Sequence, residues 1–122
     1  MIKILLVDDD NDFRGMVAEI LEAKGFFVRQ ENNGIDGMTT FNKGTFDLII
    51  TDLMMPGQDG IGVIMEIKNN KPDQKIIAMS GGGNWGGIDY LEMTKDLGVD
   101  AIFEKPFSSL KFIAHIKILL GL

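Results

Sequence analysis

The stretch Ile2–Asp10, with the sequence Ile-Lys-Ile-Leu-Leu-Val-Asp-Asp-Asp, is a short apolar run that ends in three acids. A run of this length and composition is typical of a strand buried on both faces of a parallel sheet. Apolar residues then recur at intervals of three and four, which predicts an amphipathic helix: Phe13, Met16, Val17, Ile20 and Leu21. Asp10 or Asn11 can cap the start of this helix, and Gly25 can end it. The stretch therefore predicts a strand followed directly by a helix.

The same alternation of strand and helix continues to the end of the chain. Strands are expected at 26–31, 46–51, 75–79 and 100–104, with 26–31 polar enough for a sheet edge. Helices are expected at 34–43, from Asp59 to Ile67, between the loop 81–87 and Gly98, and from Ser108 or Ser109 to Leu120. This order predicts an α/β fold in which a doubly wound parallel sheet, strand order 2-1-3-4-5, lies between two helical layers. No linker or break in composition interrupts residues 1–122, which predicts one domain.

Composition narrows the functional classes. The chain has 122 residues, no cysteine and a net charge of −6, and only two of its twelve basic residues are arginine. The absence of cysteine excludes disulfides, thiolate metal sites and cysteine nucleophiles. An acidic surface with little arginine argues against direct nucleic-acid binding. No apolar run approaches the length of a membrane span and no targeting segment is visible, so we expect a cytoplasmic protein without membrane contact.

Polar side chains stand where the predicted strands end. Asp8 and Asp9 follow the first strand, Asp52 the third, Ser80 the fourth and Lys105 the fifth. Ligand sites of open α/β sheets lie at the carboxyl ends of the strands, and strands one and three are neighbours in the predicted order. The three carboxylates should therefore converge in one crevice, opposite the lysine.

Three converging carboxylates need a proton or a cation. Two of them repel by roughly 4 kcal/mol at a separation of 4 Å and an effective dielectric constant near 20. Oxygen ligands with open positions suit Mg²⁺, which binds proteins through one or two carboxylates and can also hold a phosphoryl oxygen. With the positive charge of Lys105 and the hydroxyl of Ser80, the crevice is suited to hold a phosphoryl group beside a carboxylate.

Other interpretations of these residues remain. Each acid taken alone could be a solvated turn residue. Residues Gly81–Gly86 match G-x-G-x-x-G between a strand and a helix, which is typical of a small nucleotide- or flavin-binding module. Residues Asp8–Asp10 match the D-x-D motif of haloacid-dehalogenase-like phosphatases, although Asp12 and the small size of the chain argue against that class. The nucleotide and flavin alternatives give no role to the acids at the strand ends.

Four motifs together resemble the receiver domain of two-component response regulators, a CheY-like domain with a flavodoxin-like fold. They are Leu6–Asp10, Asp52–Gly60, Met79-Ser80 and Phe103–Phe107, and in this order and spacing they cover essentially the whole chain. The resemblance implies a phosphoacceptor domain in phosphorelay signalling rather than an enzyme.

The resemblance also implies a role for the polar residues. Asp52 would be the phosphoacceptor, and Lys105 and Ser80 would contact its phosphoryl group. Phe103 is similar to the aromatic switch residue of the family, which turns inward when the hydroxyl of Ser80 moves. The bond between Lys105 and Pro106 would be cis.

The metal site that the resemblance implies uses oxygen ligands. Asp9 would bind Mg²⁺ directly and Asp8 largely through water. Asp52 and the main-chain carbonyl of Met54 would complete the protein ligands.

Partners follow from the same resemblance. A sensor histidine kinase or a phosphotransfer protein would supply the phosphoryl group, and a downstream protein would recognise the phosphorylated form. The recognised surface would be the fourth helix, the fifth strand and the last helix, and it could also form a homodimer. A second apolar stripe on the last helix, Leu110, Ala114 and Ile118, is either a set of scattered surface residues or a partner surface.

Overall fold

The computed structural model describes residues 1–53, 60–81 and 96–122. Its elements are β1 (Lys3–Val7), α1 (Asn11–Glu22), β2 (Phe27–Glu31), α2 (Gly34–Lys43), β3 (Leu48–Asp52), α3 (Gly60–Asn70), β4 (Ile76–Ser80), β5 (Ala101–Glu104) and α5 (Ser109–Leu120). These elements confirm the predicted alternation. The helix expected before Gly98 falls on residues 82–95 and the cap expected at Asp59 on residues 54–59, so both predictions lie outside the described residues.

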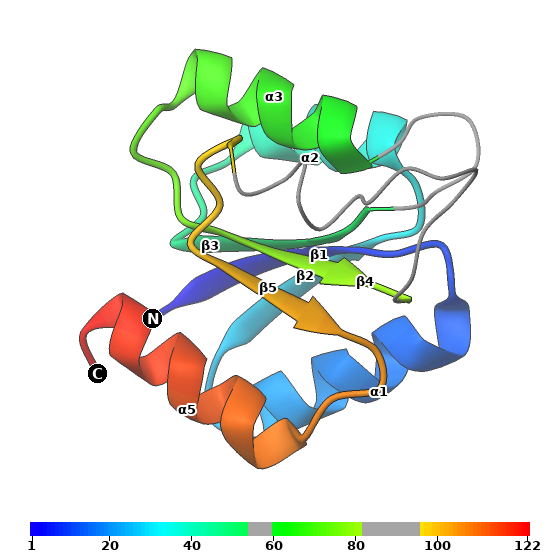
Figure 1. Ribbon diagram of the computed structural model, residues 1–122, viewed down its shortest axis with the longest axis vertical. Coiled ribbons are helices and arrows are strands. Elements are labelled where there is room, and N and C mark those ends of the chain that lie inside the picture. Colours follow the sequence, from blue (N-terminus) through cyan, green and yellow to red (C-terminus); the bar gives the residue numbers. More distant parts are fainter. Residues whose placement is uncertain (54–59, 82–95) are drawn as a thin grey trace.

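The sheet has five parallel strands in the order β2-β1-β3-β4-β5, as predicted. Figure 1 shows α1 and α5 on one face of the sheet and α2 and α3 on the other. The fold is therefore the doubly wound α/β/α sandwich. None of the helices among residues 1–53, 60–81 and 96–122 is both long enough and apolar enough to cross a bilayer.

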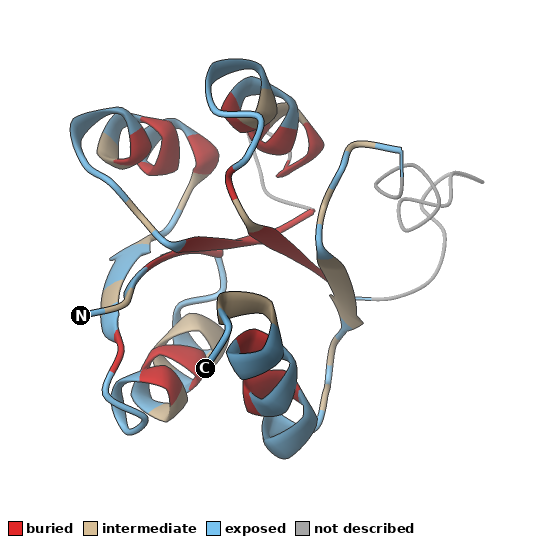
Figure 2. Cartoon of the chain, turned by 90° about the vertical axis from the view of Figure 1, so that its left-hand side faces the viewer, coloured by how far each residue is buried: buried red, intermediate tan, exposed pale blue. Residues whose placement is uncertain are grey.

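The core consists of two apolar layers, one on each face of the sheet. The layer toward α1 and α5 includes Ile4, Leu6 and Ile50, while Leu5 and Ile49 point into the layer toward α2 and α3. The central strands β3 and β4 are buried along their whole length, and β2 at the edge is largely exposed (Figure 2). Continuous apolar runs thus mark strands that are covered on both sides.

Two strand boundaries differ from the prediction in a way that concerns function. We expected the third and fourth strands to end at Thr51 and Met79, but β3 and β4 each continue one residue further, to Asp52 and Ser80. Both side chains are buried. Asp52 and Ser80 are therefore held by the sheet itself rather than by a loop.

The start of α1 is fixed by a cap directly after the first acids. The carboxylate of Asp10 accepts a hydrogen bond from the main-chain N–H of Phe13 at 3.0 Å. This bond satisfies one of the free donors at the helix start. The cap places the first turn of α1 immediately beside the end of β1.

Helix α3 begins unusually close to the end of β3. A Cβ atom built on Gly60 would lie 1.9 Å from the main-chain oxygen of Asp52. The main-chain N–H of Gly60 donates to the carbonyl of Leu53 at 2.9 Å. Glycine at this position lets the helix approach the strand that carries Asp52.

We predict that Gly60→Ala lowers the free energy of unfolding by about 3 kcal/mol, because an added methyl group would meet backbone atoms of Asp52 and Leu53 that cannot move away. Gly15→Ala, in the middle of α1, is the matched control, because a Cβ atom there meets nothing within 4 Å. The control should leave the stability unchanged or raise it by up to about 1 kcal/mol. Urea unfolding measures both, and equal stabilities of the two variants would contradict the close approach.

Candidate functional site

Three carboxylates meet at the carboxyl ends of β1 and β3, the edge toward which the strand arrows point in Figure 1. Asp8, Asp9 and Asp52 each offer one oxygen, and these atoms lie within 4.8 Å of one another. The pairing of Val7 with Thr51 across the two strands brings the acids together. Asp8 is fully buried, Asp52 is 6% exposed and Asp9 is exposed, so the cluster is buried on the inside and open at Asp9. The predicted convergence is confirmed.

Lys105 reaches into this cluster from the end of β5. Its Nζ donates to Oδ2 of Asp8 at 2.7 Å and to Oδ2 of Asp52 at 3.1 Å. The lysine side chain is only 18% exposed, so both contacts are shielded from water. The peptide bond between Lys105 and Pro106 is cis, as the resemblance implied. One ammonium therefore bridges the two buried carboxylates.

The carboxylates of the cluster also change the pKa of Lys105. Burial of Lys105 by itself lowers the pKa of its ammonium. The hydrogen bond and charge of Asp8, together with those of Asp52, outweigh this and raise the pKa above its ordinary value of 10.5. Lys105 therefore stays charged throughout the physiological range.

Asp8 is held in place by contacts that the sequence analysis did not identify. Its Oδ1 accepts a hydrogen bond from the main-chain N–H of Asp10 at 3.0 Å. Nη1 of Arg14 donates to the main-chain carbonyl of Asp8 at 2.7 Å, and Nε of Arg14 donates to Gln30 at 3.1 Å. Arg14 follows the Asp10 cap by one helical turn, and that spacing is the signal by which it could have been found.

Ser80 ends β4, the strand next to Asp52, and is 4% exposed. Its main-chain carbonyl accepts a hydrogen bond from the N–H of Lys105 at 2.6 Å. The strand end that carries Ser80 thus lies directly beside the residue that bridges the acids. Met54 and residues Gly82–Gly86 fall outside the described residues.

Phe103, the expected switch residue, does not share a face of the sheet with Ser80. Phe103 is paired with Met79, and both side chains pack into the layer toward α1 and α5. Because side chains alternate along a strand, Ser80 points to the opposite face from Met79. On β5 it is Ile102, packed into the layer toward α2 and α3, that shares the face of Ser80.

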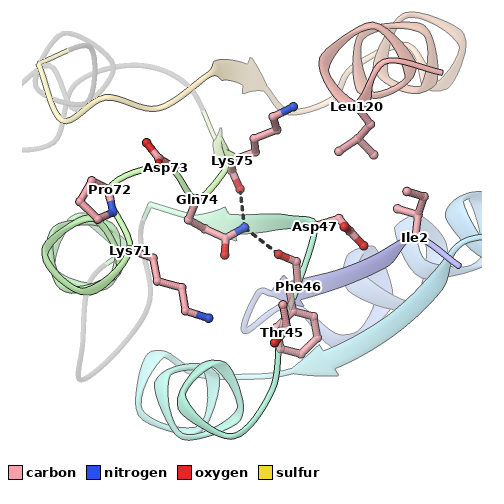
Figure 3. A pocket seen from close by; sticks show the side chains of 10 residues that line it. All are labelled: Ile2, Thr45, Phe46, Asp47, Lys71, Pro72, Asp73, Gln74, Lys75 and Leu120. Carbon is pink, nitrogen blue, oxygen red and sulfur yellow. Dashed lines mark hydrogen bonds between the residues drawn. The ribbon is translucent and has the colours of Figure 1, made fainter.

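A cavity of about 510 Å³ lies at the opposite edge of the sheet, between the starts of the strands and the end of α5 (Figure 3). The side-chain N–H groups of Gln74 donate to the main-chain carbonyls of Phe46 and Lys75 there. Nζ of Lys75 donates to the carbonyl of Leu119. These side chains bond to main-chain carbonyls and so connect the loops at this edge of the sheet. The cluster of Asp8, Asp9 and Asp52 therefore remains the candidate site.

The donor set of the cluster fits a hard divalent cation. All three groups are carboxylates, and the ammonium of Lys105 contacts two of them. Mg²⁺ prefers oxygen ligands and keeps several of its waters, which the open side at Asp9 permits. Chemically, the arrangement can bind a cation and place a second anionic group next to Asp52.

We predict that the contribution of Lys105 to stability disappears at high pH. Because the pKa of Lys105 is higher in the folded than in the unfolded protein, its stabilising effect is complete below about pH 10.5 and is lost as the pH rises through the folded value. Without metal, Lys105→Met should lower the free energy of unfolding by about 3 kcal/mol at pH 8, since buried carboxylates lose their partner. The difference from wild type should shrink above about pH 10.5.

Urea unfolding between pH 8 and 11.5 measures this effect. The matched variant Lys111→Met, on the exposed side of α5, reports the general effect of losing one positive charge. A difference between wild type and Lys105→Met that stays constant or grows above pH 10.5 would contradict the account.

Comparisons with known proteins agree with this geometry. The family model described as "Response regulator receiver domain" matches residues 4–117. The sporulation initiation phosphotransferase F of Bacillus subtilis is 31% identical over 105 residues, which cover 86% of this chain and 82% of that protein. The CpxR homologue of Haemophilus influenzae, a transcriptional regulatory protein, is 34% identical over 122 residues, which are 98% of this chain but 51% of that protein. The chain thus spans about half the length of that relative.

Among solved structures, the response regulator TrrA of Thermotoga maritima, in complex with Mg²⁺-BeF, is 29% identical with a TM-score of 0.86. The match covers 98% of this chain and 99% of that one. The family match spans nearly the whole chain, and the acids and the lysine of its motifs meet at the carboxyl edge of the sheet. The chain therefore belongs to the response regulator receiver domain family of two-component signalling.

Proposed function

We propose that residues 1–122 act as a single receiver domain in which Asp52 accepts a phosphoryl group from a sensor histidine kinase or a phosphotransfer protein in the cytoplasm. The observation that carries the proposal is the double contact of Lys105 with Asp8 and Asp52 inside the acidic cluster. This arrangement places a carboxylate nucleophile beside a buried cation. A phosphoryl group at Asp52 would find a positive charge already in position.

Burial supports Asp52 as the acceptor rather than Asp8. The side chain of Asp8 has no exposed surface, and its oxygens are engaged by Lys105 and by the main chain of Asp10. The side chain of Asp52 retains 8% exposure at the same pocket. A donor can therefore approach Asp52, whereas phosphorylation of Asp8, which the phosphatase alternative requires, would need the end of β1 to open.

The transfer step needs one bond to form and one to break. A carboxylate oxygen of Asp52 attacks phosphorus, the bond between phosphorus and the histidine nitrogen breaks, and its electron pair remains on the imidazole. The ammonium of Lys105 then pairs with the oxygens that gather negative charge. In the proposal the Ser80 hydroxyl donates to one of these oxygens.

The residues that would hold Mg²⁺ are the carboxylates of Asp8, Asp9 and Asp52 and the main-chain carbonyl of Met54. The oxygen cluster supports the three carboxylates in this role, as does the Mg²⁺-BeF complex of the Thermotoga relative, whereas Met54 lies outside the described residues. When bound, the ion supplies positive charge to the phosphoryl oxygens. Asp9, the exposed member, leaves the site accessible from solvent.

We also propose that phosphorylation changes a surface formed by the fourth helix, β5 and α5, and that a partner protein or a second copy recognises this surface. Of this surface, β5 and α5 lie in the described residues. Leu110 and Ile118 on α5 are 82% and 78% exposed, which supports a contact surface there. The apolar stripe on α5 thus faces solvent. In this proposal the partner is a protein rather than nucleic acid or a membrane.

We predict that acetyl phosphate and Mg²⁺ add one phosphoryl group to the wild-type protein and none to Asp52→Asn, because the amide is not a nucleophile. Intact mass measures the adduct. Asp12→Asn is the matched control: this acid lies in the first turn of α1, outside the cluster, and its variant should still be modified. An adduct that persists in Asp52→Asn would overturn the assignment, and an adduct that moves to Asp8 would favour the phosphatase alternative.

We also predict that Asp9→Asn has opposite effects on stability with and without Mg²⁺. Without metal, removing one of three mutually repelling charges should raise the free energy of unfolding by about 1 kcal/mol. With Mg²⁺ in the millimolar range, wild type should gain stability through binding and the variant should gain little.

Thermal unfolding with and without Mg²⁺ measures both effects. Asp73→Asn, an exposed acid at the opposite edge of the sheet, is the control for a change in net charge (Figure 3). An equal gain with Mg²⁺ in wild type and Asp9→Asn would show that the ion binds elsewhere.

A further inference from the structure

The bridging lysine has a third neighbour besides the two carboxylates. Nζ of Lys105 lies 4.4 Å from the centroid of the Phe13 ring, over the face of the ring. Phe13 belongs to the first turn of α1, and in the sequence it stands out only as one of the apolar residues of that helix. None of the roles proposed so far accounts for an aromatic face at this point of the pocket.

We propose that Phe13 is a positioning residue for phosphoryl transfer, which holds the ammonium of Lys105 at the acidic cluster through a cation–π contact. This inference rests on the proposed function, because the transfer step is where the position of Lys105 matters. No role in binding the phosphoryl group or the metal ion is assigned to Phe13. It acts through Lys105.

The hydrogen-bond inventory of the ammonium supports this role. A lysine ammonium has three donors, and Lys105 directs one to Asp8 and one to Asp52. The aromatic face covers a further side of the ammonium, where water would otherwise solvate it. Because the negative face of a ring attracts a cation, Phe13 compensates for part of the lost solvation without competing for the carboxylates.

The ring of Phe13 is itself held from several sides. Its main-chain N–H is bonded to the Asp10 carboxylate. Its ring meets Phe107 edge-to-face, with centroids 5.7 Å apart, and Phe107 stacks on the fully buried Phe112 at 4.5 Å. The cap of α1 and this aromatic cluster therefore fix the surface over which the ammonium lies. A long flexible side chain gains a defined position from such a rigid neighbour.

A substitution that keeps the volume of Phe13 but removes its aromatic ring distinguishes a cation–π contact from ordinary packing. Leucine would fill much of the same space but has no aromatic face. A Phe13→Leu variant should therefore keep the fold and lose the contact with the ammonium, whereas Phe13→Tyr should keep both. The matched control is Phe27→Leu at the start of β2, where the phenylalanine is 47% exposed and belongs to the edge strand.

The first test is the rate at which saturating acetyl phosphate with Mg²⁺ modifies each variant, followed by intact mass. Phe13→Leu should be slower by about three- to tenfold, the size expected for a partly desolvated cation–π contact. Phe13→Tyr and Phe27→Leu should stay within about twofold of wild type, since both keep an aromatic ring at position 13. A rate for Phe13→Leu equal to that of wild type would overturn the inference.

The second test changes the electron density of the Phe13 ring and leaves its shape nearly constant. Site-specific incorporation of phenylalanine with increasing numbers of ring fluorines at position 13 keeps the shape nearly constant while it weakens the negative face. The rate should fall stepwise with fluorination. A rate that does not depend on fluorination would show that Phe13 has only a packing role, even if Phe13→Leu fails to fold.

The third test needs no phosphorylation. In the unmodified protein, the ring should shift the NMR signals of the Lys105 Hε protons upfield, and Phe13→Leu should abolish this shift. If wild type takes no phosphoryl group at Asp52, the proposed function fails, but the NMR signals still decide whether the contact exists. Unshifted signals in wild type would contradict the contact itself.

Discussion

The repulsion among three carboxylates is the constraint on which the rest of the structure depends. The parallel pairing of β1 and β3 brings the oxygens of Asp8, Asp9 and Asp52 within 4.8 Å of one another, partly out of water. Each pair of such charges costs several kcal/mol at this separation, of the order of 4 at an effective dielectric constant near 20. The sheet can hold them together because its apolar strands are buried on both faces and resist separation. Lys105 offsets part of the repulsion, and the excess negative charge makes the pocket receptive to a cation.

The same constraint connects the pocket to more distant parts of the chain. Lys105 comes from the end of β5, two strands away from Asp52, so the balance of charge depends on the order of the whole sheet. The first turn of α1 contributes Arg14, which holds the main chain of Asp8, and Phe13, which lies under the ammonium. Any change of charge at Asp52 must alter the contacts of Lys105. Through the contacts of Lys105 with Phe13, such a change would also reach helix α1 and the aromatic cluster near α5.

The sequence was sufficient for the fold and for the convergence of the acids. Local patterns identify the strands, and the strand order of this fold class then places the ends of the first and third strands side by side. The apolar runs identify the buried strands, and polar residues at their ends identify the edge where a site forms. A cap at Asp10 or Asn11 and the helix 34–43 were also predictable, since capping residues and apolar spacing act within a few residues; the structure has the cap at Asp10. The face on which Phe103 lies was not predictable: Ile102 and Phe103 are both apolar, so alternation does not show which one points toward α5. The contact between Lys105 and Asp8 spans 97 positions and depends on how far a flexible side chain reaches.

The most direct measurement of the central claim is anomalous diffraction from crystals grown with Mn²⁺ in place of Mg²⁺. The account predicts one strong anomalous peak among the carboxylates of Asp8, Asp9 and Asp52, which disappears when excess Mg²⁺ competes for the site. The absence of a peak at these residues, with Mn²⁺ bound elsewhere on the acidic surface, would contradict it.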